Sequence, residues 1–76
     1  MEEKVRLIMA RILEVDVDKI GEDTSPDTIE NWDSLHHLNL ILSLEEEFGI
    51  TFSENEIVEL LNYQLIVMSL REKCVG

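Results

Sequence analysis

Groups capable of chemistry gather in one short stretch of the sequence, which contains Asp33, Ser34, His36 and His37. A serine beside a histidine suggests a hydrolytic nucleophile, and histidines beside a carboxylate suggest a metal site. A serine at the start of a helix suggests a third role, because free N–H groups and the positive end of the helix dipole stabilise a phosphate there. The surrounding residues decide among these three roles.

Hydrolysis is poorly supported by the surroundings of Ser34. His37 follows at the helical spacing i+3, but the sequence has no Gly-x-Ser-x-Gly elbow and no evident third residue to orient the imidazole. A chain of 76 residues also has few residues with which to line an active-site cleft. We therefore do not expect this serine to act as a catalytic nucleophile.

A metal site is no better supported by the two histidines. Adjacent helical residues point about 100° apart, so the rings of His36 and His37 should diverge. The i, i+4 spacing of helical zinc ligands is also absent. We interpret both histidines as ordinary surface residues and expect no metal.

The same stretch opens one long helix. Asp33 is a strong N-cap residue, and Gly49 is a natural stop because glycine readily takes the left-handed conformation found at helix ends. The apolar residues between them cover an arc of about 220°, which is more than an ordinary surface helix buries. We assign one edge of this arc to the core, namely Leu40, Ile41, Leu44 and Phe48. The other edge lies in line with Ser34 and could stay exposed for docking; it comprises Leu35, Leu38 and Leu42. The alternative is a central helix packed on two sides.

The chain before this helix predicts a first helix and a long connection. Residues 2–14 repeat apolar side chains at a spacing of three and four, which indicates an amphipathic helix. Residues 15–30 are rich in turn-forming residues and read as a loop. We expect Ile20 and Ile29 to pin this loop to the core.

The chain after this helix predicts one short helix and one longer helix. Ser53 and Glu56 form a capping-box pattern that opens a brief helix through residue 61. We expect Asn62 to cap a final helix over residues 63–73, with an inward face made of Leu65, Ile66, Leu70 and either Met68 or Val67. The expected fold is all-α, a small up-and-down bundle of three main helices and one short helix, in one domain over residues 1–76.

Charge and composition narrow the possible partners. The net charge of −11 argues against nucleic acid, whose phosphates attract basic surfaces. All six Lys and Arg residues lie outside the interval 20–70, so this acidic middle should attract basic patches on partner proteins.

Cys74 is the single cysteine, which excludes an internal disulfide and fits a reducing compartment. The chain shows no secretory signal and no apolar run long enough to span a membrane, and we expect a cytoplasmic monomer.

Asp33-Ser34-Leu35, together with Leu38, Leu40 and the run Leu44-Glu45-Glu46-Glu47-Phe48-Gly49-Ile50, resembles the acyl carrier protein family. The resemblance covers nearly the whole chain. It implies that a phosphopantetheinyl transferase uses coenzyme A to attach a covalent 4′-phosphopantetheine arm to Ser34. It also implies that acyl groups ride on this arm as thioesters, and that the carrier performs no catalysis. The implied surface for acyl-loading and acyl-processing enzymes comprises Leu35, Leu38, Leu42, Glu45 and Glu46.

Two departures from the family pattern bear on the pathway. Carriers of primary fatty acid synthesis usually have acidic residues at the positions of His36 and Asn39, where this chain has no acidic side chain. This suggests a specialised fatty acid, lipid or polyketide pathway. Asp33 stands where peptidyl carriers commonly place a histidine, which argues mildly against an aminoacyl cargo. An aminoacyl or peptidyl carrier and a non-catalytic acidic interaction module remain the alternatives.

Overall fold

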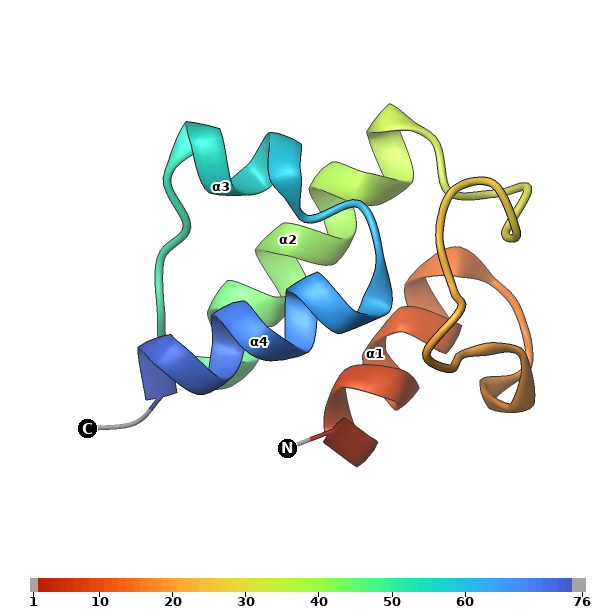
Figure 1. Ribbon diagram of the computed structural model, residues 1–76, viewed down its shortest axis with the longest axis horizontal. Helices are drawn as coiled ribbons and strands as arrows, with labels where there is room; N and C mark the ends of the chain where they lie inside the picture. The colour runs from red at the N-terminus through yellow and green to blue at the C-terminus, as the bar shows by residue number, and fades with distance from the viewer. Residues whose placement is uncertain (1, 75–76) are drawn as a thin grey trace.

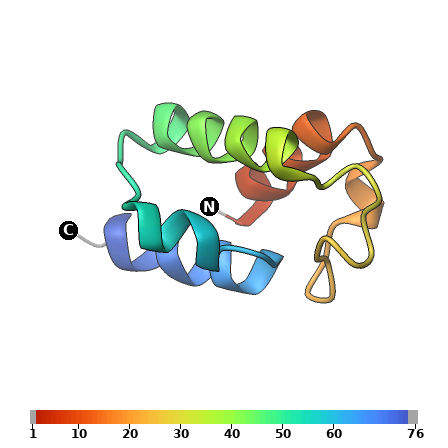
Figure 2. The same cartoon turned by 90° about the horizontal axis from the view of Figure 1, so that it is seen from above.

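Four α-helices and one short 3₁₀ helix make up the computed structural model, which describes residues 2–74 (Figure 1). The elements are α1 (Glu2–Leu13), η1 (Val17–Lys19), α2 (Ser34–Phe48), α3 (Glu54–Glu59) and α4 (Tyr63–Cys74). In the view from above, α2 runs along one side of the molecule, and α3 lies with α4 along the other (Figure 2). The predicted all-α fold, with three main helices and one short α-helix, is confirmed.

Both ends of α2 close as the sequence predicts. At the start, Asp33 Oδ1 accepts the main-chain N–H of His36 at 2.9 Å, which satisfies one donor of the first turn. At the end, Gly49 takes φ = +64° and its N–H donates to the Glu45 carbonyl. A side chain at that position would be strained by its Cβ. The Glu45 carboxylate accepts the N–H of Phe52 at 2.8 Å, so it stabilises the turn that follows α2.

The core lies between α1, α2 and α4, with Ile20, Ile29 and Trp32 from the connection between α1 and α2 added to it. The fully buried side chains are Val5, Met9, Leu13, Ile20, Leu40, Ile41, Leu44, Ile66 and Leu70. The predicted core edge of α2 is therefore confirmed at Leu40, Ile41 and Leu44. Phe48, also assigned to this edge, is only partly buried and packs at the margin of the core.

The inward face of α4 differs from the prediction at Leu65, which is 40% exposed. Tyr63 begins the helix and is itself buried. The buried face therefore continues from Tyr63 at the helical spacing i+3, i+4 and i+7, through Ile66, Val67 and Leu70. Leu65 and Met68 fall on the outer face, so Val67 occupies the inward position.

The predicted loop over residues 15–30 contains the 3₁₀ helix η1, which was not predicted from the sequence. Two i to i+3 hydrogen bonds form this helix, from the N–H groups of Lys19 and Ile20. Ile20 and Ile29 are both buried, so their predicted role as anchors of this segment is confirmed.

Thr24 fixes the same segment through hydrogen bonds made by its side chain and its main chain. Its buried hydroxyl accepts the N–H of Gly21 at 2.7 Å and donates to the carbonyl of Lys19 at 3.1 Å. Its main-chain carbonyl accepts the N–H of Tyr63 at 3.0 Å. The connection is therefore tied to the first residue of α4.

The capping box that opens α3 is confirmed. Ser53 Oγ accepts the N–H of Glu56 at 3.2 Å, and the Glu56 carboxylate accepts the N–H of Ser53 at 2.9 Å. The helix ends at Glu59, before the predicted residue 61, because the N–H of Leu61 turns to the Glu59 carbonyl. Asn62 Oδ1 accepts a main-chain N–H of the first turn of α4 at 2.8 Å, which confirms its capping role.

Candidate functional site

Ser34 is the first residue of α2, and its side chain is exposed. The first N–H groups of a helix have no acceptor within the helix, and the positive end of the helix dipole lies at the same place. A helix of 15 residues carries this dipole in full. A phosphate ester on the Ser34 hydroxyl would therefore gain electrostatic stabilisation from α2.

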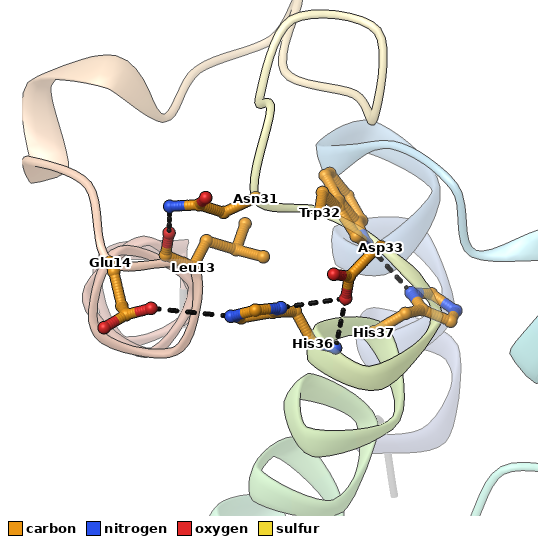
Figure 3. Close-up of polar contacts among 7 residues, drawn as sticks. All are labelled: Leu13, Glu14, Asn31, Trp32, Asp33, His36 and His37. Atoms are coloured by element: carbon orange, nitrogen blue, oxygen red, sulfur yellow. Dashed lines mark hydrogen bonds and ion pairs between the residues drawn. The ribbon is translucent and has the colours of Figure 1, made fainter.

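The segment that leads into α2 is fastened to α1. Asn31 Nδ2 donates to the carbonyl of Leu13, the last residue of α1, at 3.0 Å (Figure 3). Glu14 follows with φ = +58°, a left-handed conformation that is uncommon for a residue other than glycine. Its side chain extends toward the start of α2 (Figure 3). The start of α2 is thus positioned by the end of α1.

His36 bridges two carboxylates at this junction (Figure 3). Its Nδ1 lies 2.8 Å from Asp33 Oδ1, and its Nε2 lies 3.5 Å from Glu14 Oε2. A doubly protonated imidazole has a donor for each of these acceptors. The side chain is 25% exposed, so His36 does lie at the surface, and its interpretation as an ordinary surface residue is wrong only because it overlooks these two ion pairs.

The pKa values of this cluster follow from its hydrogen bonds. The Asp33 side chain raises the pKa of His36 above its usual range, and Glu14 adds to the effect. The main-chain N–H of His36, followed by its imidazole, holds the pKa of Asp33 below its usual range. Both shifts favour the charged forms, so the N-cap carboxylate is ionised at neutral pH.

His37 is also wrongly interpreted as a surface residue, because it is only 8% exposed. The Trp32 indole Nε1 donates to His37 Nδ1 at 3.0 Å (Figure 3), and the two rings stack with centroids 6.0 Å apart. Since Nδ1 is the acceptor, the ring proton resides on Nε2. Nε2 then donates to the carbonyl of Ile57 in α3 at 2.7 Å.

The sequence does contain a signal for the burial of His37. His37 precedes Leu40 by three residues, Ile41 by four and Leu44 by seven, so it lies on the helix face assigned to the core. Its hydrogen-bond partner Ile57 has no such signal, because it lies 20 residues away. The burial of His37 was therefore predictable, and its contact with α3 was not.

These contacts leave neither histidine as an evident base for Ser34. Both ring nitrogens of His36 face carboxylates, and both ring nitrogens of His37 have partners in Trp32 and Ile57. Within residues 2–74, no group of three or more metal-binding side chains converges. None of the helices in that range has the length and apolar character needed to cross a membrane.

The surface beside Ser34 is apolar along α2. Leu35 is 66% exposed, Leu38 is 51% exposed and Leu42 is 61% exposed, so the predicted docking edge does lie at the surface. Exposed leucines in such a row commonly mark a contact area for another molecule. Glu46 is exposed beyond Leu42, whereas Glu45 is half-buried and directs its carboxylate to the turn after α2.

A hollow of about 410 Å³ lies on the other side of Ser34. Trp32 and His37 contribute to its wall, and Val58 and Leu61 contribute from α3 and the residues after it. Val58 is 65% exposed and Leu61 is 48% exposed. Neither residue was predicted from the sequence to belong to the site, although the apolar run in and after α3 exceeds what one face of a short helix can bury.

Comparison with known proteins agrees with this geometry. The family model for the phosphopantetheine attachment site matches residues 3–67. An acyl carrier protein of Thermosynechococcus vestitus is 37% identical over 71 residues, which cover 93% of this chain and 88% of that protein. An acyl carrier protein of Petrotoga mobilis is 34% identical, and the match covers 93% of this chain and 84% of that protein. An acyl carrier protein of Buchnera aphidicola is 32% identical over 73 residues, which cover 96% of this chain and 92% of that protein.

Proposed function

Because the chain belongs to the acyl carrier protein family, whose members carry a covalent 4′-phosphopantetheine arm and catalyse no reaction themselves, we propose that Ser34 is its attachment residue. In this reaction the Ser34 hydroxyl oxygen attacks the β-phosphorus of coenzyme A and forms a phosphodiester. The bond to the adenosine bisphosphate is broken, and the hydroxyl proton passes to a base on the transferase. Acyl groups are then held as thioesters on the terminal thiol of the arm.

The position of Ser34 is the observation that carries this proposal. Its side chain is exposed at the first residue of the longest helix, and Asp33 caps that helix beside it. Ser53 also stands exposed at a helix start, but its Oγ accepts the N–H of Glu56 and caps a helix of six residues. The Ser34 hydroxyl is therefore accessible to another protein and lies at the positive end of the dipole of a long helix.

The proposed docking surface follows α2 away from Ser34. Leu35, Leu38 and Leu42 supply exposed apolar contacts, and the carboxylate of Glu46 lies at the far end. Glu45 contributes charge to the same end, although its carboxylate also accepts the N–H of Phe52. A complementary partner presents an apolar patch and basic residues, which speed association and fix orientation.

A specialised fatty acid, lipid or polyketide pathway is supported by the neutral side chain of Asn39 and by the environment of His36. The His36 ring bridges Asp33 and Glu14, so it adds positive charge between two carboxylates close to Ser34. A partner that evolved to meet acidic residues at these positions would find a different charge pattern. The cytoplasmic location and the monomeric state stay predictions.

Intact mass after incubation with coenzyme A, magnesium and a broad-specificity phosphopantetheinyl transferase tests the attachment residue. The wild type should gain one phosphopantetheine, Ser53→Ala should gain the same mass, and Ser34→Ala should gain none. Ser34→Ala should retain the helical circular dichroism of the wild type. A mass gain on Ser34→Ala, or no gain on the folded wild type with several transferases, would contradict the proposal.

A further inference from the structure

The C-terminal end of α3 lacks the usual hydrogen bond for one of its carbonyls. In a longer helix, the N–H of Leu61 would donate to the carbonyl of Ile57. Here that N–H donates to Glu59 instead, at 2.9 Å. The carbonyl of Ile57 accepts from His37 Nε2 at 2.7 Å, so a side chain of α2 replaces the missing main-chain donor of α3.

The donor that serves Ile57 is itself held in one tautomer. The indole N–H of Trp32 occupies His37 Nδ1 at 3.0 Å, which leaves the proton on Nε2. Trp32 is 5% exposed and His37 is 8% exposed, so water has little access to compete for these groups. A chain of two hydrogen bonds, one buried and one part-buried, therefore links Trp32, two residues before Ser34, to α3.

The position of α3 determines what lies beside Ser34. Val58 directly follows the carbonyl that His37 holds, and both Val58 and Leu61 line the hollow that Ser34 borders. Val58 is mostly exposed and Leu61 is about half exposed, so both are available to another protein. An enzyme that reaches the Ser34 hydroxyl has to cover the hollow next to it, because the hydroxyl lies at its margin.

We propose that His37 is a positioning residue for arm attachment, which holds Val58 and Leu61 in the surface that the phosphopantetheinyl transferase covers when it binds at Ser34. This inference rests on the proposed function of Ser34. The transferase is expected to present an apolar contact to the two side chains. Loss of the hydrogen bond to Ile57 weakens binding of the carrier without changing the chemistry at the hydroxyl.

Two substitutions of His37 separate its two hydrogen bonds. In His37→Gln, the amide nitrogen reaches the place of Nε2 and can still donate to Ile57. In His37→Asn, the shorter amide reaches only the place of Nδ1, so it can contact Trp32 and cannot reach Ile57. Amide hydrogen exchange over residues 54–61 reports the position of α3, and steady-state loading of Ser34 gives kcat and KM for the carrier.

His37→Asn should speed exchange over residues 54–61 and raise KM by about fivefold, the effect of one lost hydrogen bond, with kcat unchanged. In His37→Gln, the exchange rate over residues 54–61 and the KM should both lie close to those of the wild type. The double variant Val58→Ser, Leu61→Ser changes exposed side chains only. It should raise KM to a similar extent while exchange in α3 stays as in the wild type.

Three results would overturn the inference, each with the wild type loading normally. Unchanged exchange in His37→Asn would show that His37 does not hold α3. Unchanged KM in the double variant would show that the transferase does not contact Val58 and Leu61. Equal KM values for His37→Gln and His37→Asn would show that the Ile57 hydrogen bond is not the cause. Failure of the wild type to accept the arm would instead contradict the proposed function.

Discussion

A single oxygen of Asp33 accepts two hydrogen bonds from His36, one from its main-chain N–H at 2.9 Å and one from its Nδ1 at 2.8 Å. The first bond caps α2, and the second draws the imidazole between Asp33 and Glu14. The N-cap of the helix that begins with Ser34 is therefore coupled to the protonation of a histidine. Stability and pH are linked at this point of the fold.

The stabilisation by His36 should depend on pH. Its pKa is raised in the folded state above the ordinary value of 6.5, so its contribution is complete below pH 6.5 and is lost as pH rises through the raised pKa. The pKa of Asp33 is lowered, so its contribution is complete above the ordinary value of 3.8 and falls only as pH drops through the lowered pKa. Between the two ordinary values both contributions are present.

Thermal unfolding of the wild type and of His36→Gln should show this dependence. The difference in Tm should be largest between pH 3.8 and 6.5 and should shrink in alkaline buffer. His37→Gln serves as the comparison, because His37 faces Trp32 and a main-chain carbonyl and no carboxylate. A difference in Tm for His36→Gln that is constant with pH would contradict the coupling.

Leu42→Glu should separate docking from folding. Leu42 is 61% exposed, so the free energy of unfolding should change by less than about 0.5 kcal/mol. The KM of an acyl-processing partner should rise by fivefold or more, which corresponds to the loss of about 1 kcal/mol at a contact residue. Leu7→Glu is the matched control, because Leu7 is 54% exposed on α1 and lies outside the proposed surface. A similar rise in KM for both variants would indicate a charge effect without a specific site.

Thr24→Val should destabilise the connection between α1 and α2. The substitution keeps the shape of the side chain but removes the hydroxyl that serves Gly21 and Lys19, and it leaves a part-buried N–H without this acceptor. The expected loss is about 1–3 kcal/mol in the free energy of unfolding, measured by urea titration. Thr28→Val is the control, since the hydroxyl of Thr28 makes similar local bonds at an exposed position where water can replace them. If the two variants lose the same free energy of unfolding, burial of the Thr24 hydroxyl is not the cause of the destabilisation.

The elements that the sequence predicts well are those defined within one turn of the chain. Asp33, Ser53 and Asn62 each accept an N–H three residues ahead, and Gly49 closes a helix through its own φ angle. Such signals need no knowledge of the rest of the fold. The exposure of Leu35, Leu38 and Leu42 follows from the same helical geometry, together with the limited core of a small domain.

The features that escape prediction depend on partners distant in sequence. The contact of His37 with α3 cannot be predicted, because its partner, the carbonyl of Ile57, lies 20 residues away. The outward position of Leu65 depends on Tyr63, whose N–H is held by the carbonyl of Thr24 across the fold. The short helix η1 has weak local signals, and the buried anchor Ile20 follows it directly. Tertiary packing decides each of these cases.

The residues that precede Ser34 are fixed from two directions, by Asn31 to the end of α1 and by Trp32 to His37 and thereby to α3. Ser34, the proposed attachment residue, therefore follows an anchored segment and has little freedom to move with the chain. A cargo on an arm attached to Ser34 moves by rotation about the bonds of that arm. The volume that the cargo samples is a sphere around a stationary point, so its local concentration at a docked enzyme depends on the length of the arm and on where that enzyme binds.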